Sequence, residues 1–295
     1  MSVIATLAPL PGARDARDPQ RAIKRGPSRV PREEVAATQR DRLYDGLVRT
    51  VAEHGYANAS VSDICRASGV TRPAFYEHFE SKQGAFLAAY RHGTEVLFAM
   101  LRSAFEEAQA EIEAEAEAGA EAEAEPVSAD RDGPRCLAAW ARTTTRVLAV
   151  LLDVLSSVPA FATAAIVEID AVGPAGRRAR NELLRDFEAF FAPAPATPPE
   201  ADRPELIGCV VAGAYGTLYR YIAEGRVAEL PDLLPTLVYF VVAPFAGPQT
   251  AARAASEAAG FLMVGTDHQR SVAPCVPAQA ETGAAGRPAA GESGA

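Results

Sequence analysis

The stretch that decides the fold runs from Ser60 to Lys82 and reads SVSDICRASGVTRPAFYEHFESK. Its first four residues fit a capping box, because the Ser60 hydroxyl can accept a hydrogen bond from the backbone of Asp63 while the Asp63 carboxylate reaches back. A capping box marks the start of a helix. The apolar residue that follows predicts a short helix to about Ser68.

A second short helix is predicted directly after a two-residue turn. Gly69 and Val70 form the turn, and Thr71 can cap the helix that spans about Arg72 to Phe79. Pro73 is tolerated there because N–H groups in the first turn have no intrahelical partner. Two short helices with this spacing are typical of a helix-turn-helix, whose second helix enters the major groove of DNA. An ordinary helical hairpin explains the spacing equally well. The types of side chain are therefore needed to distinguish a helix-turn-helix from a hairpin.

The side chains of these two helices favour the DNA-reading interpretation. Four apolar residues can lock the pair against the preceding helix: Ile64, Val70, Phe75 and Phe79. Six polar residues remain to face outward: Ser62, Thr71, Arg72, Tyr76, Glu77 and His78. A helix that presents such groups can reach base edges and phosphates.

Helices are also predicted on both sides of the pair. Leu43 and Leu47 lie four apart in a helix from Glu33 to His54, which Gly55 can end in a left-handed conformation. After the pair, Ser81 can cap a long helix. One apolar stripe runs along that helix: Phe86, Tyr90, Leu97 and Met100 or Leu101.

Charge is divided unevenly along the 295 residues. The net charge of −9 by itself disfavours a nucleic-acid partner. Residues 1–95 nevertheless hold 14 Lys and Arg against 11 Asp and Glu, while residues 96–295 hold 15 against 27. The basic part opens with an arm predicted to be disordered when free, which ends in Arg21, Lys24, Arg25, Arg29 and Arg32. A basic module is thus joined to an acidic one.

The remainder of the chain also reads as helix. Nine glutamates, almost all alternating with Ala, lie between Glu106 and Glu125. We expect a solvated helical extension or a flexible linker there, because Ala and Glu favour helix while neighbouring like charges oppose it. Further helices are predicted at 136–158, 161–172, 177–191, 205–223 and 230–245. No segment shows sustained strand alternation, so the predicted fold class is all-α.

The stretch from Ser60 to Lys82 resembles the signature of the tetracycline-repressor (TetR) family. The likeness is dense from Arg40 to Leu101 and softer over Val167–Arg178 and Tyr219–Phe245, while the acidic run and both tails have no counterpart. The resemblance implies an N-terminal three-helix helix-turn-helix DNA-binding domain and a C-terminal helical ligand-binding and dimerisation domain. The chain then divides into a disordered basic arm (1–32), the helix-turn-helix domain (33–80), a linking helix (81–105), the acidic Ala/Glu insertion (106–134), the ligand-binding and dimerisation domain (135–247) and a disordered tail (248–295).

The resemblance also implies which residues meet DNA. By family position, three would contact phosphates: Tyr76, His78 and Lys82. Three others would lie nearest the bases: Ser62, Thr71 and Arg72. Lys82 stands at a helix start, where exposed N–H groups and the helix dipole already favour an anion. Tyr and His side chains can donate hydrogen bonds to phosphate without specifying sequence.

Four residues are candidates for lining a pocket for an unidentified small-molecule ligand: Trp140, Arg142, Thr144 and Phe161. Aromatic residues at helical spacing are more often ordinary core. Polar groups inside an apolar helix are a better clue, because an inward-pointing polar group needs a partner that a ligand could supply.

The sequence offers no pattern for catalysis, metal or membrane. No Ser/Cys/His constellation, paired carboxylates or phosphate loop stands out, so we expect no enzyme and no cofactor. The four cysteines lie tens of residues apart, which predicts neither a zinc site nor a disulfide framework. The longest apolar run is far short of the ~20 residues that span a bilayer. We expect a cytoplasmic protein with no membrane partner.

These observations predict a sequence-specific transcriptional regulator. The leading hypothesis is a homodimeric repressor that a ligand releases from a palindromic double-stranded DNA operator. We place the dimer contact on 205–223 and 230–245, because the apolar residues of the second helix repeat too widely for one buried face. The alternatives are an activating member of the same family, an interaction protein that uses the acidic run, and an all-α enzyme.

Overall fold

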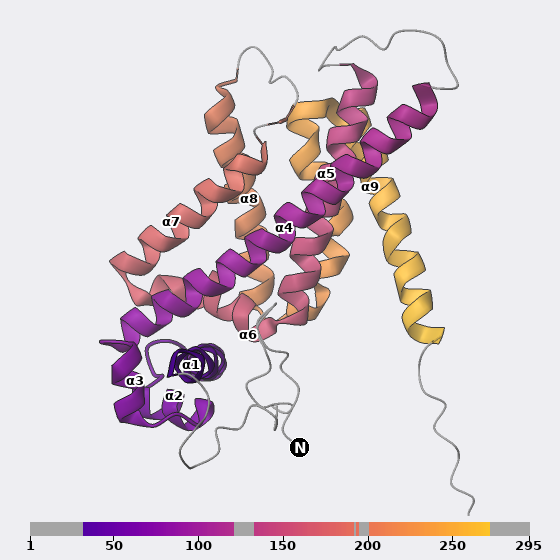
Figure 1. Ribbon diagram of the computed structural model, residues 1–295. Coiled ribbons are helices and arrows are strands. Elements are labelled where there is room, and N and C mark those ends of the chain that lie inside the picture. The colour runs from indigo at the N-terminus through magenta and orange to yellow at the C-terminus, as the bar shows by residue number, and fades with distance from the viewer. Residues whose placement is uncertain (1–31, 121–132, 192, 195–200, 272–295) are drawn as a thin grey trace, which may run out of the picture.

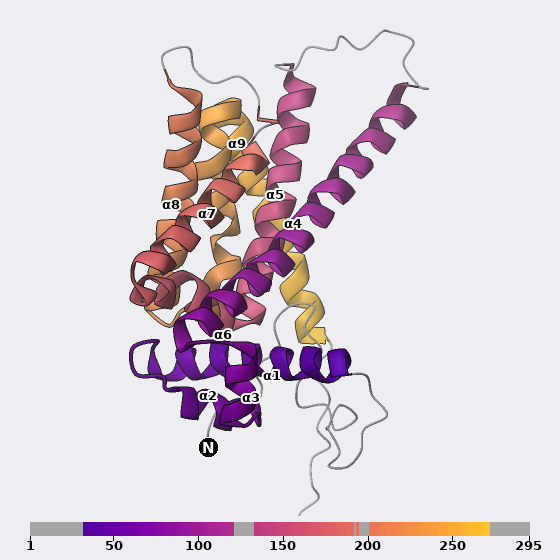
Figure 2. The same ribbon diagram turned by 60° about the vertical axis from the view of Figure 1, so that its left-hand side comes forward.

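The computed structural model describes residues 32–120, 133–191, 193–194 and 201–271, and the predicted basic arm before residue 32 lies outside these ranges. The described residues form helices and no strand, which confirms the all-α class. The first three helices make a small domain at one end of the molecule, and the others form a taller bundle above it (Figures 1 and 2). We call the small domain, residues 32–83, the head.

The head consists of α1 (Arg32–His54), α2 (Val61–Ser68) and α3 (Arg72–His78). Its turns follow the predicted capping chemistry. The Ser60 hydroxyl accepts a hydrogen bond from the Asp63 N–H at 3.2 Å, and the Asp63 carboxylate accepts one from the Ser60 N–H at 3.2 Å. Gly69 ends α2 at φ 66°, a left-handed conformation that favours glycine. The predicted capping box and turn are therefore confirmed.

The helix α4 (Lys82–Ala120) joins the head to the bundle and crosses it diagonally (Figure 1). The Ser81 hydroxyl accepts a hydrogen bond from the Gly84 N–H at 3.0 Å and so caps the helix. No break separates the predicted linking helix, 81–105, from the first part of the acidic run. Ala108 in that run is only 6% exposed, so the extension packs against the bundle on one side.

The bundle contains α5 (Pro134–Ser157), α7 (Pro174–Glu188), α8 (Arg203–Ala223) and α9 (Leu234–Ser271). Short helical pieces join them: α6 (Pro159–Ala162), the π-helix η3 (Thr163–Val167), and the 3₁₀ helices η4 (Glu168–Val172), η5 (Ala189–Phe191) and η6 (Val227–Leu233). The prediction of one regular helix over 161–172 is thus wrong. The spacing of apolar residues shows which side chains are buried, but it does not distinguish an α-helix from a π- or 3₁₀-helix. The change of helix type within this segment was therefore not predicted.

The helix α9 is interrupted at Gly247, whose φ of 80° and ψ of 161° are not helical. Pro244 and Pro248 flank the break and remove N–H donors there. After the break the chain returns to helix as far as Ser271, with Ala251, Ala254 and Ala258 buried on one side. The prediction of a disordered tail from residue 248 is therefore wrong for 248–271. The sequence offered a possible short helix over Ala251–Val264, but its small alanines gave too weak an apolar pattern to predict the whole helix.

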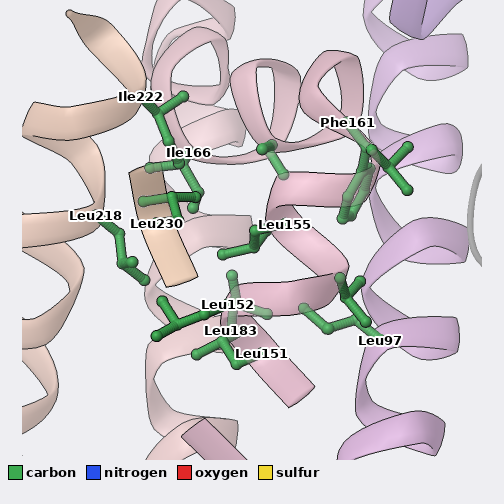
Figure 3. Close-up of a cluster of buried hydrophobic side chains, with 14 of the residues drawn as sticks. Leu97, Leu151, Leu152, Leu155, Phe161, Ile166, Leu183, Leu218, Ile222 and Leu230 are labelled. Atoms are coloured by element: carbon green, nitrogen blue, oxygen red, sulfur yellow. The ribbon is translucent and has the colours of Figure 1, made fainter. Parts of the chain in front are cut away.

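The bundle has one continuous apolar core. Figure 3 shows side chains that converge from several helices, among them Leu97 of α4, Leu155 of α5, Leu183 of α7 and Leu218 of α8. The apolar residues of α9 are also buried within the chain, Val238 and Val242 completely. The argument that these α9 residues need a second subunit to cover them is therefore wrong, since neighbouring helices of the same chain cover them.

Two stretches, Arg203–Ala223 and Val227–Gly260, are long and apolar enough to cross a membrane by length and composition alone. In this fold they surround the core, and the second is interrupted at Gly247. Part of their apolar content is buried in the bundle, Val210, Leu237 and Val241 among it, and the buried share is 22% of the first apolar window and 50% of the second.

Candidate nucleic-acid interface and ligand cavity

The outer face of α3 presents polar side chains from the surface of the head. Phe75 is fully buried and fixes the opposite face of this short helix against the rest of the head. Thr71, Arg72 and Tyr76 are exposed, and Tyr76 has 48% of its surface accessible. The Arg72 guanidinium lies 6.0 Å from the centre of the Tyr76 ring. Ser62 is exposed on α2.

His78 is the last residue of α3 and is only partly exposed. Its Nε2 lies 3.1 Å from the Gln39 Oε1 of α1, a hydrogen bond in which the amide oxygen accepts. Burial lowers the pKa of His78 below its usual value, and the nearby charge of Arg40 lowers it further. The imidazole is therefore neutral at pH 7 and is a hydrogen-bonding group rather than a fixed cation.

Lys82 makes hydrogen bonds within the head. Its ammonium donates hydrogen bonds to the backbone carbonyls of Tyr56 at 2.7 Å and Ala59 at 2.9 Å, and it lies 4.3 Å from the centre of the Tyr56 ring. Two of its three N–H groups thus hold the loop between α1 and α2. One N–H group is left for a phosphate.

Two polar contacts connect the head to the segment that follows α6. The Glu168 carboxylate of η4 accepts a hydrogen bond from the Tyr56 N–H at 2.7 Å. The Gln83 side-chain amide of α4 donates to the Val172 carbonyl at 3.2 Å. The sequence analysis did not find these contacts, because neither residue has a recognisable motif and the partners are far apart in the chain.

The bundle encloses an apolar cavity of about 90 Å³ between α4, α5, α7, α8 and α9. Its wall contains no charged residue, and its two residues with hydroxyl groups are Thr94 and Tyr215. The other lining residues are Leu97, Leu148, Leu151, Leu155, Phe161, Ala165, Ile166, Leu183, Leu184, Phe187, Phe191, Val210, Val211, Ala214, Leu218 and Val241. Such a wall suits an apolar small molecule.

Of the four predicted pocket residues, the structure places Phe161 in the cavity wall. Trp140 is buried but packs on the rings of Phe191 and Phe245, at centroid distances of 6.4 and 5.6 Å. Thr144 is partly buried, one helical turn before the part of α5 that lines the cavity. Arg142 is exposed and lines a separate pocket of about 650 Å³ between α4, α5 and α9.

The Arg142 guanidinium donates two hydrogen bonds to the Glu115 carboxylate, at 2.7 and 2.9 Å. Its polar group thus finds its partner on the acidic part of α4. The sequence analysis could not anticipate this pair, because the acidic run showed no position that differed from its neighbours.

Comparison with known proteins identifies the head. Residues 43–89 match the bacterial regulatory proteins of the tetR family. The head is therefore a tetR-family head. In the tetR-family head, the matched region covers most of α1, all of α2 and α3, and the start of α4, so it contains every predicted DNA-contacting residue.

Relatives and solved structures agree with this assignment. The chain is 37% identical over 68 residues to the HTH-type transcriptional repressor Rv1474c of Mycobacterium tuberculosis, which is 23% of this chain and 36% of that protein. It is 40% identical over 52 residues to the HTH-type transcriptional repressor AcnR of Corynebacterium glutamicum, which is 18% of this chain and 28% of that protein. The alignments thus span about a third of these relatives' length.

The fatty acid degradation regulator FadR from Bacillus halodurans superposes with a TM-score of 0.51 and 15% identity, over 75% of this chain and 97% of that chain. This likeness extends beyond the head and shows that the bundle has the same fold.

Proposed function

We propose that this protein is a dimeric transcriptional repressor that a small apolar molecule releases from a palindromic operator. The observation that carries the proposal is the continuity of α4, which begins in the head at Lys82 and lines the apolar cavity with Thr94 and Leu97. A molecule that enters the cavity must contact the helix on which the head is mounted. As a DNA-binding regulator, the protein would act in the cytoplasm.

The DNA-binding part of the proposal rests on the exposed face of α3. Arg72 can donate two parallel hydrogen bonds to a guanine edge. Tyr76 carries a hydroxyl that can donate to a phosphate, and the remaining N–H of Lys82 can do the same. The buried Phe75 keeps these side chains outward, so α3 can approach the major groove as a recognition helix.

The coupling between cavity and head rests on the segment from Pro159 to Val172. Phe161 and Ile166 of this segment line the cavity, while Glu168 and Val172 contact the head through hydrogen bonds. A ligand that moves the cavity side of the segment therefore also strains the contacts on its head side. Only a ligand that binds one head arrangement better than the other shifts the equilibrium between them.

The proposed dimer contact lies on the same two helices that the sequence suggested, but on their exposed sides. Leu218 and Val241 line the cavity, so they cannot face a partner. An exposed strip lies beside them on α8 and α9, and we call it the α8–α9 strip: Cys209, Ala212, Gly216, Tyr219, Thr236, Tyr239 and Phe240. Phe240 packs against Gly213, which shows that the two helices form one surface.

The three aromatic residues of the α8–α9 strip are 38–44% exposed, which is unusual for large apolar side chains. Two-fold pairing of the strip would cover them, and two-fold symmetry would match a palindromic operator.

The proposal is tested by selecting bound duplexes from a random DNA library with the full chain and titrating the selected site in a mobility-shift assay. Two symmetric half-sites should emerge, and the affinity should fall linearly with the logarithm of salt concentration. Apolar small molecules should then be screened for release of the bound duplex. A monomer that binds all duplexes alike would contradict the proposal.

A further inference from the structure

Three polar side chains, Tyr90, Arg180 and Tyr215, interact electrostatically beside the apolar cavity. Tyr90 lies one turn before Thr94 on α4, and Arg180 lies one turn before Leu183 and Leu184 on α7. Tyr215 of α8 belongs to the cavity wall itself. Helical periodicity therefore places Tyr90 and Arg180 on the cavity-facing sides of their helices, at the end closer to the head.

Two polar atoms in this group have no partner. The Tyr90 hydroxyl is buried without a hydrogen bond, in a side chain whose residue is only 5% exposed. The Arg180 Nε is also buried without a hydrogen bond. Native proteins rarely leave such groups unpaired, because each costs the full penalty of its lost hydration. The Tyr90 O–H and the Arg180 Nε–H can both donate a hydrogen bond, so an acceptor oxygen would satisfy them.

The partners of the other atoms are known. Arg180 donates from Nη1 to both oxygens of Asp170, at 2.7 and 2.6 Å, and from Nη2 to the Asn181 side chain at 3.4 Å. The Tyr215 hydroxyl donates to the Ile166 carbonyl at 2.9 Å and also accepts a hydrogen bond from the Arg180 guanidinium. Burial raises the pKa of Tyr215 to about 12, so this hydroxyl keeps its proton at physiological pH.

A small void beside the cavity reaches the same group. It measures about 10 Å³ and is lined by Tyr90 together with Phe161 and Ala165. Phe161 and Ala165 also line the main cavity, so the void that Tyr90 lines adjoins it.

The charges decide which acceptor fits. Arg180 and Asp170 form an ion pair and cancel each other, and Glu182 adds a negative field at Tyr90. The cavity wall adds no cation. A carboxylate would therefore bring an uncompensated negative charge into an apolar site, which is costly, whereas a neutral carbonyl oxygen would not.

We propose that Tyr90 and Arg180 form a recognition site for a neutral carbonyl oxygen, as in an ester, lactone or ketone, of a ligand whose apolar part fills the cavity. This rests on the proposed function, since it specifies the ligand of the same cavity. Asp170 belongs to η4, which also carries the Glu168 contact to the head. An acceptor bound to Arg180 would therefore act on the element that connects cavity and head.

The test compares three probes of similar size on the full-length protein: methyl heptanoate, heptanoate and heptane. Thermal unfolding midpoints report binding, since a ligand of the folded state raises them. Methyl heptanoate should raise the midpoint most, heptane less and heptanoate least. Tyr90→Phe removes only the hydroxyl, so it should weaken the ester by about tenfold and leave heptane unchanged.

Tyr44→Phe, on α1 and outside the cavity wall, is the matched control and should change neither. A second readout is the carbonyl stretch of the bound ester, which hydrogen bonding shifts to lower frequency; Tyr90→Phe should partly reverse the shift.

The outcomes separate this inference from the proposed function. If ester and heptane bind equally and Tyr90→Phe has no effect, the carbonyl site is refuted while the apolar cavity stands. If heptanoate binds best, the neutral acceptor is refuted. If neither ester nor heptane binds, the cavity itself is not a ligand site, and both proposals fall.

Discussion

The carboxylate of Glu168 accepts the backbone N–H of Tyr56 at 2.7 Å, across 112 residues of chain. Glu168 comes from η4, two residues after the cavity-lining Ile166, and Tyr56 comes from the loop that Lys82 also holds. This single hydrogen bond therefore connects the segment that lines the cavity to the loop that precedes α2. A charged acceptor on a backbone donor is stronger than a neutral pair, so the contact can transmit strain.

Replacement of Glu168 tests this connection. Glu168→Ala leaves the Tyr56 N–H without its acceptor and should lower the free energy of unfolding by about 1–2 kcal/mol. It should also blunt ligand-induced release, because the cavity segment would no longer act on the head. Urea denaturation and the mobility-shift assay measure the two effects. Glu229→Ala, which removes an exposed ion pair with Arg226, is the control and should change neither appreciably. Full ligand response in Glu168→Ala would show that the coupling runs elsewhere.

Arg72 is the strongest candidate for reading a base, because its guanidinium is exposed at the start of α3. Arg72→Ala should reduce discrimination between the operator and a mismatched site by ~1–3 kcal/mol if it contacts a guanine edge. Binding to unrelated duplexes should weaken much less. Competition titrations with matched and mismatched duplexes measure the difference. An equal loss for all duplexes would assign Arg72 to the phosphates instead.

Lys82 should behave differently, because two of its hydrogen bonds are internal. Lys82→Ala should weaken binding to all duplexes alike and also lower the unfolding midpoint of the protein, since the Tyr56 and Ala59 carbonyls lose their donor. A phosphate contact alone would reduce DNA binding and its salt dependence without changing stability. Unchanged stability would therefore show that the internal hydrogen bonds contribute little.

The lowered pKa of His78 predicts a pH dependence of stability. The folded state binds this proton less readily than the unfolded chain, because burial and Arg40 disfavour the imidazolium. The stability that depends on His78 is thus fully present above pH about 6.5 and is lost as the pH falls through the lowered pKa. His78→Gln should reduce the difference between urea midpoints at high and low pH. His54→Gln, at the exposed end of α1, is the control, and an equal change in both variants would contradict the assignment.

The α8–α9 strip predicts the dimer. Tyr239 is 44% exposed, and Tyr239→Glu would place a charge at the centre of the proposed contact. Light scattering should then detect monomers that keep their helical content but lose tight operator binding. Met100→Glu alters another exposed apolar residue, on α4, and should leave the dimer intact. If Tyr239→Glu remains dimeric, the contact lies elsewhere on the surface.

Local chemistry explains why the head could be predicted in detail. Ser60 and Asp63, Gly69 and Thr71 each fix a backbone feature through a contact within a few residues. Such contacts are visible in the sequence because both partners lie in one short window. Phe75, predicted among the apolar residues that lock the pair, is likewise buried.

Long-range contacts explain what the sequence analysis missed. Tyr90 was assigned to the apolar stripe of its helix, and it is indeed buried, but its unpaired hydroxyl matters only beside Arg180. Nothing in the sequence places these two residues together, since 90 positions separate them. Val241 shows the reverse error. It looked like an unpaired apolar surface because the helices that cover it could not be identified from α9 alone.

Gly93 and Phe161 provide the last prediction, because they meet where α4 crosses the segment after α5. A Cβ on Gly93 would overlap the Phe161 ring, with Cδ2 and Cζ both 2.9 Å away. Phe161 is 2% exposed and lines the cavity, so the ring has little room to move. Gly93→Ala should therefore lower the free energy of unfolding by about 1–3 kcal/mol through overpacking.

Phe161→Leu should lower the stability as well, because it leaves a space where the ring was. The two substitutions combined should cost less than the sum of their separate effects, since the smaller side chain makes room for the added methyl group. Gly260→Ala, whose Cβ would meet nothing within 4 Å, controls for the change in helix propensity and should be neutral or slightly stabilising. Urea denaturation of the four variants and the parent measures the coupling. If the change in the free energy of unfolding of the double variant equals the sum of the two single changes, Gly93 and Phe161 are not in tight contact. In that case α4 can shift relative to the cavity wall without a clash with the Phe161 ring.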